Sequence, residues 1–153
     1  MVDIRLARLG DGPELARLRW QYAHEGHASV LPLKEFQADF LTFLDPALES
    51  GRWGIWVADA EDRIVGTLSV QLIDRAPRPV PSNRWKAYIT GAYVEPSLRN
   101  GGIGRALLDA AVVWAREHGA GSCIVWPTPR SEPFYRRAGF DATAALELPA
   151  DPH

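Results

Sequence analysis

The sequence predicts an α/β (α+β) fold, with a mixed, mostly antiparallel central sheet and helices on both faces. Two observations lead to this prediction. Residues 53–73 read as a hairpin of two strands, and residues 85–126 read as strand, helix, strand. A hairpin pairs its strands antiparallel, whereas a crossover through a helix pairs them parallel, so a sheet containing both is mixed. The expected order is β-α-α-β-β-β-α-β-α-β in one domain, residues 1–153.

Composition narrows the class of protein. The 153 residues are 46% hydrophobic and 24% charged, as in ordinary soluble domains, and the net charge of -2 disfavours a role in binding nucleic acid. The start of the chain lacks a signal-peptide pattern, and its apolar runs are too short for a membrane span. The one cysteine, Cys123, lies in an apolar run, so neither an internal disulfide nor a cysteine metal cluster is expected. These observations favour a cytoplasmic protein without a metal, a membrane or a nucleic acid as partner.

The first third of the chain alternates between strand and helix signals. Alternation over residues 2–6 predicts a strand. Asp11 is expected to cap the following helix, with Glu14 completing a capping box, and the helix should fade near Gly26. A second helix is expected after Pro32 and should end or kink at Pro46. Its apolar face is formed by residues at helical spacing: Phe36, Phe40, Phe43 and Leu44.

In the middle of the chain, the pattern of apolar residues changes from helical spacing to the two-residue spacing of a strand. Strands are expected over 53–59 and 63–73, joined by a short turn. Residues 75–83 contain three prolines and form a loop, of the kind that often shapes the mouth of a substrate site. The next strand covers 85–94, with Gly91 as a candidate bulge.

The last elements follow a third helix that starts after Gly101–Gly102 and stops at Gly119. Its buried stripe consists of Ile103, Leu107, Ala111, Trp114 and Ala115. A strand is expected over 122–126. A short helix should then lie between Ser131, as its cap, and Gly139, and a last strand should cover 140–148.

The turn before the third helix is the most informative segment. A strand ends at Val94, and the helix starts a few residues later. The first amides of a helix have no intrahelical partner and lie at the positive end of its dipole. Glycines leave these amides accessible, and Arg99 and Arg105 add positive charge on either side. The turn therefore predicts a pyrophosphate site built largely from backbone N–H groups.

The glycines of this turn also fit a plain structural role, because glycine serves tight packing at strand-to-helix junctions, and the residues alone leave that alternative open. A dinucleotide-binding Gly-x-Gly-x-x-Gly would need glycine where Leu107 stands. A Walker turn would need lysine after Gly104, where the sequence has Arg105. Neither of these phosphate motifs fits.

Two motifs resemble those of a known family. The run Arg99-Asn100-Gly101-Gly102-Ile103-Gly104 resembles the Arg/Gln-x-x-Gly-x-Gly/Ala signature of the GCN5-related N-acetyltransferase (GNAT) family. Tyr135 to Phe140 resembles that family's Tyr-x-x-x-Gly-Phe element, one helix and one strand downstream. The resemblance implies an acyl-CoA N-acyltransferase-like fold. It also implies transfer of acetyl from acetyl-CoA to an amine of a small molecule or peptide by direct attack in a ternary complex.

The same resemblance implies roles for individual residues. Tyr135 would protonate or stabilise the leaving thiolate of CoA. The main chain around Ala92, Tyr93 and Val94 would bind the pantetheine arm and polarise the thioester carbonyl. Thr128 stands where many relatives carry an asparagine that touches the pantetheine. The pyrophosphate would be held by the segment of the glycine turn, which comprises Arg99, Asn100, Gly101, Gly102, Ile103, Gly104 and Arg105.

The general base is left unassigned. Many relatives carry a carboxylate on the strand before the glycine turn, but residues 85–94 contain none. Glu95 comes next, at a position where a solvent-facing side chain is the alternative to a catalytic one. The remaining candidates are a water chain and the polar cluster His24, Glu25 and His27.

Further questions stay open at the level of the sequence. Four aromatic residues either line an acceptor pocket or belong to the core: Trp20, Tyr22, Trp85 and Tyr88. The arginines of the 75–84 loop either meet an acidic acceptor or are plain surface. Amino acids, polyamines, aminoglycosides and protein N-termini are all possible acceptors, and a homodimer is compatible with the family. The alternatives to an enzyme are a non-catalytic CoA-binding or ligand-sensing domain and an unrelated nucleotide binder.

Overall fold

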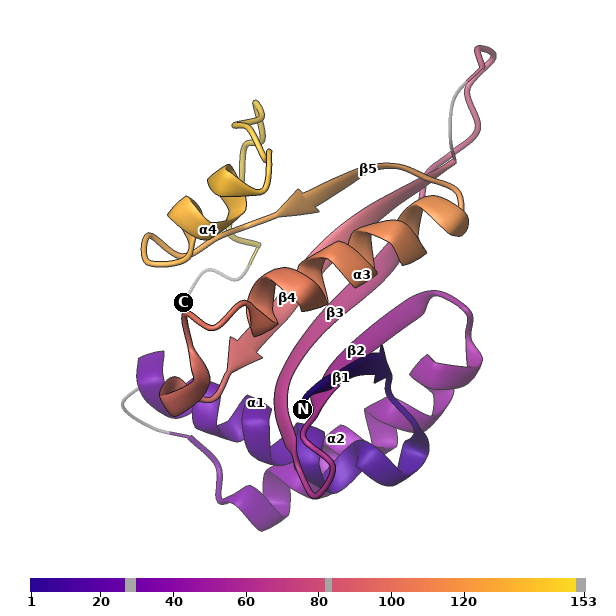
Figure 1. Ribbon diagram of the computed structural model, residues 1–153. Coiled ribbons are helices and arrows are strands. Elements are labelled where there is room, and N and C mark those ends of the chain that lie inside the picture. The colour runs from indigo at the N-terminus through magenta and orange to yellow at the C-terminus, as the bar shows by residue number, and fades with distance from the viewer. Residues whose placement is uncertain (27–29, 82–83, 151–153) are drawn as a thin grey trace.

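Five strands form one mixed sheet in the computed structural model, which describes residues 1–26, 30–81 and 84–150 (Figure 1). The sheet order is β1-β2-β3-β4-β5, from Asp3–Leu6, Trp53–Asp59, Ile64–Asp74, Trp85–Val94 and Ala120–Val125. The helices are α1 Gly12–Gly26, α2 Leu33–Glu49, α3 Ile103–Glu117 and α4 Glu132–Arg137, with 3-10 turns η1 Leu9–Asp11 and η2 Pro96–Leu98. Neighbouring strands are antiparallel except β4 and β5, which are parallel. The predicted fold class is confirmed.

The helices cover both faces of the sheet, as predicted. Figure 1 shows α3 crossing one face, with α1 and α2 on the other side of the strands. The core under α3 includes Leu68, Val70, Ile89, Leu107, Leu108, Ala111 and Trp114. The core under α1 and α2 includes Leu15, Leu18, Leu44, Ile55, Val57 and Tyr93. Alternate residues of β2, β3 and β4 therefore supply two separate apolar layers. No helix of the described residues is long and apolar enough to cross a membrane.

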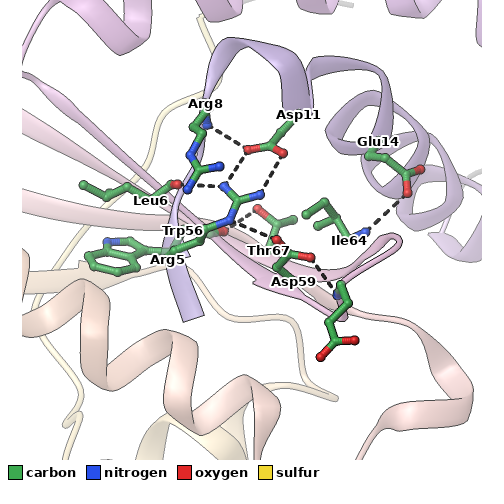
Figure 2. Close-up of polar contacts among 10 residues, drawn as sticks. Arg5, Leu6, Arg8, Asp11, Glu14, Trp56, Asp59, Ile64 and Thr67 are labelled. Carbon is green, nitrogen blue, oxygen red and sulfur yellow. Dashed lines mark hydrogen bonds and ion pairs between the residues drawn. The ribbon is translucent and has the colours of Figure 1, made fainter. Parts of the chain in front are cut away.

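The hydrogen bonds of Asp11 and Glu14 at the start of α1 differ from those of the predicted capping box (Figure 2). Asp11 lies in η1, before the helix, and accepts a hydrogen bond from the amide of Arg8 at 2.8 Å. Its carboxylate also accepts from the guanidinium of Arg5, at 2.8 and 3.0 Å, and this lowers the pKa of Asp11. Glu14 reaches across to the amide of Ile64, at 3.3 Å. The prediction was wrong because Asp11 accepts from Arg5 and Arg8, and Glu14 accepts from Ile64 and Arg17, instead of from the first amides of α1.

Pro46 lies inside α2, which continues to Glu49. Of the two predicted alternatives, an end or a kink at this proline, the end was therefore wrong. The amide of Ser50 donates to the carbonyl of Pro46 at 3.0 Å, so the helical bonding resumes one turn later. Of the predicted apolar face, Leu44 is fully buried, whereas Phe43 is 39% exposed.

The predicted last strand is absent from residues 140–148, which belong to no helix or strand. Leu146 and Leu148 are 100% and 89% exposed, so their apolar side chains contribute nothing to the core. These residues pair with no other strand, and the described sheet ends at β5.

The long loop between β3 and β4 does not shape a site. Figure 1 shows it at the far tip of the β3–β4 hairpin, away from the helices. Its described residues line neither of the two pockets described below. Arg84 is instead paired with Asp74 where the loop joins the two strands. The expectation that this loop forms a substrate mouth was wrong, since the hairpin carries it outward.

Candidate active site

The strands β4 and β5 pair over only half of β4. Their parallel register runs from Trp85 opposite Ala120 to Ile89 opposite Val125, and residues 90–94 have no partner on that side. The pairing of the two strands therefore stops before the carboxyl end of β4. An exposed strand edge carries amide and carbonyl groups that an extended ligand can pair with.

A bulge in β4 follows the point where this pairing stops. On the β3 side, Ser69 is opposite Thr90, but Thr67 is opposite Tyr93, so β4 holds an extra residue between these pairs. Gly91 lies in this bulge with φ +67°, a left-handed conformation that glycine adopts without a steric cost. The predicted bulge is confirmed.

The turn before α3 leaves a row of free amides. Gly102 is the N-cap of α3 with φ +91°, and Asn100 also has a left-handed φ of +67°. The first bond at this end of the helix runs from the amide of Ala106 to the carbonyl of Gly102, at 3.0 Å. Within the part of the chain that the structure describes, the amides of residues 100–105 donate to no other group. A Cβ added to Gly102 would meet nothing within 4 Å, so these donors are open to an anion.

One cleft of about 1350 Å³ joins these features. It extends from the start of α3 along β4 to α4. The residues predicted to bind the cofactor line it, namely Ala92, Tyr93, Val94, Arg99, Asn100, Gly102, Gly104, Arg105 and Thr128, whereas Gly101 and Ile103 do not. The structure thus brings the two sequence motifs together, and the binding role of each residue stays a prediction.

Tyr135 lines the same cleft from α4. Its side chain is only 5% exposed and packs edge-on against the rings of Phe134 and Phe140. Burial raises the pKa of its phenol to about 12. Its hydroxyl bonds to no described residue, although it is not sealed off from solvent as the indole N–H of Trp56 is. A neutral phenol with a free hydroxyl is therefore available as a proton donor in the cleft.

The two arginines predicted to flank the phosphate site are both paired. Arg99 donates to Glu25 and, at 2.8 Å, to the carbonyl of Val94. Arg105 donates to Asp109 at 2.9 Å on the exposed face of α3. Both arginines line the cleft, and carboxylates offset part of the positive charge that they add beside the turn.

Two further arginines line the cleft, and neither was singled out from the sequence. Arg130 and Arg137 have no ion pair or hydrogen bond with other described residues. Arg137 belongs to the Tyr135–Phe140 motif, so its position in that motif was the available signal. These two cations make the cleft attractive to anionic groups.

The candidate bases are mostly engaged elsewhere. Glu95 is 6% exposed rather than solvent-facing, and it pairs with Arg17, at 3.0 Å, and with Arg63. The ring of His24 hydrogen-bonds the carbonyl of Trp20 and lines neither pocket. Glu25 lines the cleft, but its carboxylate is bound by Arg99 and by the hydroxyl of Tyr93. His27 lies outside the described residues.

The aromatic candidates divide into two groups. Tyr22 and Tyr88 line the cleft, whereas Trp20 and Trp85 line neither pocket. Tyr22 also lines a second, smaller pocket of about 280 Å³ that shares Gly91 with the cleft.

Thr128 uses its hydroxyl locally. The hydroxyl accepts from the amide of Ser131 at 3.2 Å and donates to the hydroxyl of that residue at 3.1 Å. Thr128 therefore shapes the turn into α4, and a second bond to a ligand would have to compete with this turn.

An incompletely paired couple of parallel strands, a bulge and a helix start open to anions define the acyl-CoA acetyltransferase class of fold. Residues 13–140 match the model of the acetyltransferase (GNAT) family. This chain belongs to that family, a family of acetyl-CoA-dependent N-acetyltransferases, as its glycine turn predicted.

Solved structures agree over nearly the whole chain. A predicted acetyltransferase with acetyl-CoA from Clostridium acetobutylicum is 26% identical with a TM-score of 0.84, covering 97% of this chain and 96% of that one. A GCN5-related N-acetyltransferase from Ralstonia eutropha is 27% identical with a TM-score of 0.81, covering 97% and 98%.

A characterised relative matches a shorter region. A glucosamine 6-phosphate N-acetyltransferase of Trypanosoma brucei brucei is 32% identical over 80 residues. This match covers 52% of this chain and 52% of the relative, so the chain spans about half the length of that protein.

Proposed function

We propose that this chain transfers an acetyl group from acetyl-CoA to an amine of a small molecule or peptide, by direct attack in a ternary complex. The observation that carries the proposal is the continuity of one cleft from the free amides before α3, along the unpaired edge of β4, to the hydroxyl of Tyr135. The similar Clostridium structure with acetyl-CoA supports the same co-substrate.

The residues of the cleft fit acetyl-CoA part by part. The amides of residues 100–105 and the cations Arg130 and Arg137 suit its phosphates. The edge of β4 at residues 90–94 suits the two amide groups of the pantetheine arm, which can pair as an added strand does. Acetyl-CoA supplies a thioester, a carbonyl activated for attack by an amine.

The reaction needs one bond formed and one broken. The lone pair of the neutral amine forms a C–N bond to the thioester carbon, and the C–S bond breaks. Tyr135 gives its phenolic proton to the departing sulfur, the nitrogen loses its extra proton to water, and the phenolate of Tyr135 recovers a proton from that water. Cys123 takes no part, because it does not line the cleft and burial raises the pKa of its thiol.

Among the described residues, no unpaired carboxylate lines the cleft to take the proton of the amine. Glu25 is the one carboxylate among the described residues that line the cleft, and Arg99 binds both of its oxygens. We therefore assign deprotonation to water in the open cleft. The same observation favours a second candidate function, a non-catalytic domain that binds CoA or senses a ligand.

One experiment separates these functions. The protein is incubated with acetyl-CoA and a library of amines, and the products are identified by mass spectrometry. In parallel, calorimetry measures the binding of acetyl-CoA. Acetylated products with release of CoA support the transferase. Binding without any product over a broad library would support the non-catalytic domain, and the absence of binding would overturn both.

A further inference from the structure

The second pocket lies next to the reaction site and has a distinct chemical character. It is enclosed by α1, α2 and strands β2 to β4, and it meets the cleft at the bulge of Gly91. Most of its wall is apolar, from Leu15, Tyr22, Phe36, Phe40, Phe43, Trp53, Ile55 and Tyr93. Its volume of about 280 Å³ is near the lower limit for small-ligand pockets, so it suits one compact apolar group.

A cation lies at the junction of this pocket with the cleft. The guanidinium Nη1 of Arg19, on α1, is 3.1 Å from the point that a Cβ of Gly91 would occupy. Arg19 lines the pocket and has no ion pair or hydrogen bond to another described residue. Gly91 therefore leaves room for an unpaired positive charge beside the bulge.

Two hydroxyls line the same pocket as this cation. Ser69 on β3 and Thr90 on β4 are directly opposite each other in the sheet, so both side chains are on the same face. Both residues line the pocket, and neither hydroxyl bonds to another described residue. In contrast, the hydroxyl of Thr67 in the same pocket is bound to the carbonyl of Trp56 at 2.9 Å.

One guanidinium and two free hydroxyls form a donor set that suits a carboxylate, because a carboxylate accepts several hydrogen bonds and carries one negative charge. Among the described lining residues, the remaining charged group is Asp39, at the α2 side, which has no ion pair. The pocket thus holds one positive and one negative side chain. One cation on this wall disfavours the several positive charges of a polyamine or an aminoglycoside.

On the basis of the proposed transferase function, we infer that the acceptor is an α-amino acid with an aromatic or large aliphatic side chain. Arg19, Ser69 and Thr90 bind its carboxylate, and the rings of α2 enclose its side chain. Arg19 lies at the bulge, so the anion it binds must be near the nucleophilic nitrogen. An α-amino acid meets this condition, since a single carbon joins its amine to its carboxylate.

An amino sugar phosphate fits the pocket less well. Its hydroxyls would be buried against aromatic rings without hydrogen-bond partners, which is costly. Its phosphate carries up to two negative charges against the one cation of the pocket. Specificity here therefore differs from the activity named for the Trypanosoma relative.

The test compares two acceptors that differ only in the carboxylate, L-phenylalanine and 2-phenylethylamine. We expect the native protein to acetylate phenylalanine with the higher kcat/KM. Arg19→Gln should lower kcat/KM for phenylalanine roughly tenfold to hundredfold, the usual loss of a charged hydrogen bond, with little change for phenylethylamine or in the KM of acetyl-CoA. Arg78→Gln, in the distant β3–β4 loop, is the matched control. It should leave kcat/KM for both acceptors and the KM of acetyl-CoA unchanged.

Several results would overturn the inference. One is an equal loss of kcat/KM for phenylalanine and phenylethylamine in Arg19→Gln. Another is a native protein that prefers phenylethylamine to phenylalanine. A third is a higher kcat/KM for glucosamine 6-phosphate or spermidine than for phenylalanine. Calorimetry of phenylalanine with the CoA-loaded protein tests the pocket without turnover. If phenylalanine binds in a manner that depends on Arg19 but no product forms, the binding site for an α-amino acid is supported and the proposed transferase activity is refuted. If other amines are acetylated but phenylalanine does not bind, the transferase activity is supported and the binding site for an α-amino acid is refuted.

Discussion

The guanidinium of Arg99 donates to both carboxylate oxygens of Glu25, at 2.9 and 3.1 Å. This pair joins the end of α1 to the turn before α3, and the same guanidinium lies over the ring of Tyr93 and binds the carbonyl of Val94. The contact therefore fixes the side of the cleft where the helix start and the free edge of β4 meet.

Removing this pair should affect the cofactor more than the fold. Glu25→Gln should lower the stability by only about 1 kcal/mol, because both side chains are partly exposed. Since Arg99 then loses the carboxylate that holds its guanidinium in place, we expect weaker binding of acetyl-CoA, measured by calorimetry. Asp74→Asn, which breaks the exposed pair with Arg84, is the control and should leave the affinity unchanged. Equal affinities in all three proteins would show that the pair has no part in binding.

Tyr135→Phe should lower kcat by roughly 10²-fold or more, which is the usual range for a lost proton donor, with little change in the Kd of acetyl-CoA. The hydroxyl has no protein partner to lose among the described residues, so the fold should tolerate the change. Tyr88→Phe, on β4 in the same cleft, is the matched control and should keep its kcat. Steady-state kinetics and calorimetry measure the two quantities. Unchanged turnover in Tyr135→Phe would remove this residue from the mechanism.

The pH profile follows from the raised pKa of Tyr135. The phenol keeps its proton up to a pH near 12. We therefore expect no loss of kcat from its ionisation between pH 7 and pH 10. Because the folded pKa exceeds the usual 10, the associated stability is complete below pH 10 and is lost as the pH rises toward 12. Denaturant titrations at pH 9 and pH 11 should show a smaller decrease for Tyr135→Phe than for the native protein.

Gly102→Ala should weaken cofactor binding beyond its effect on the fold. A left-handed φ costs a non-glycine residue about 1–2 kcal/mol. Gly51 has a φ of +70° and equally open surroundings but lies before β2, so Gly51→Ala is a control with the same backbone cost. Both variants should lose similar stability. Only Gly102→Ala should raise the Kd of acetyl-CoA, by about tenfold, because its methyl group would lie among the free amides. A similar Kd for both variants would argue against a phosphate site here.

Glu95→Gln should act on stability rather than on chemistry. The carboxylate is buried and paired with Arg17 and Arg63, so its loss should cost about 3 kcal/mol, as for other broken buried pairs. Denaturant unfolding measures this cost, and kcat per folded molecule should stay the same. A selective loss of kcat with native stability would instead identify Glu95 as the missing base.

Local patterns predicted most of the fold. Helices α1 and α3 follow apolar spacing and end at glycine, and Gly119 has the left-handed φ of such a stop. Strand alternation was less reliable, because the exposed Leu146 and Leu148 fit a strand pattern without a neighbouring strand to pair with. The same limit explains the error at Asp11, whose carboxylate is held by Arg5 on β1 rather than by the next helix.

The cleft could be predicted because its donors are backbone groups within two continuous motifs. The acceptor pocket could not, because its donors come from three separate elements. Arg19, Ser69 and Thr90 come to line one pocket only through the sheet register and the bulge at Gly91. Sequence spacing carries no signal for such a meeting. The burial of Glu95 was missed for the same reason, since Arg17 and Arg63 are distant in the chain.

The incomplete pairing of β4 with β5 has a consequence for dynamics. The amides of residues 90–94 on that edge have no strand to protect them, so they should exchange their hydrogens with solvent faster than the amides of residues 85–89. A ligand that pairs with this edge would close the gap, and the sheet would then gain protection and heat resistance from its own substrate. Binding of such a ligand would thus complete the pairing of β4 that the folded chain leaves unfinished.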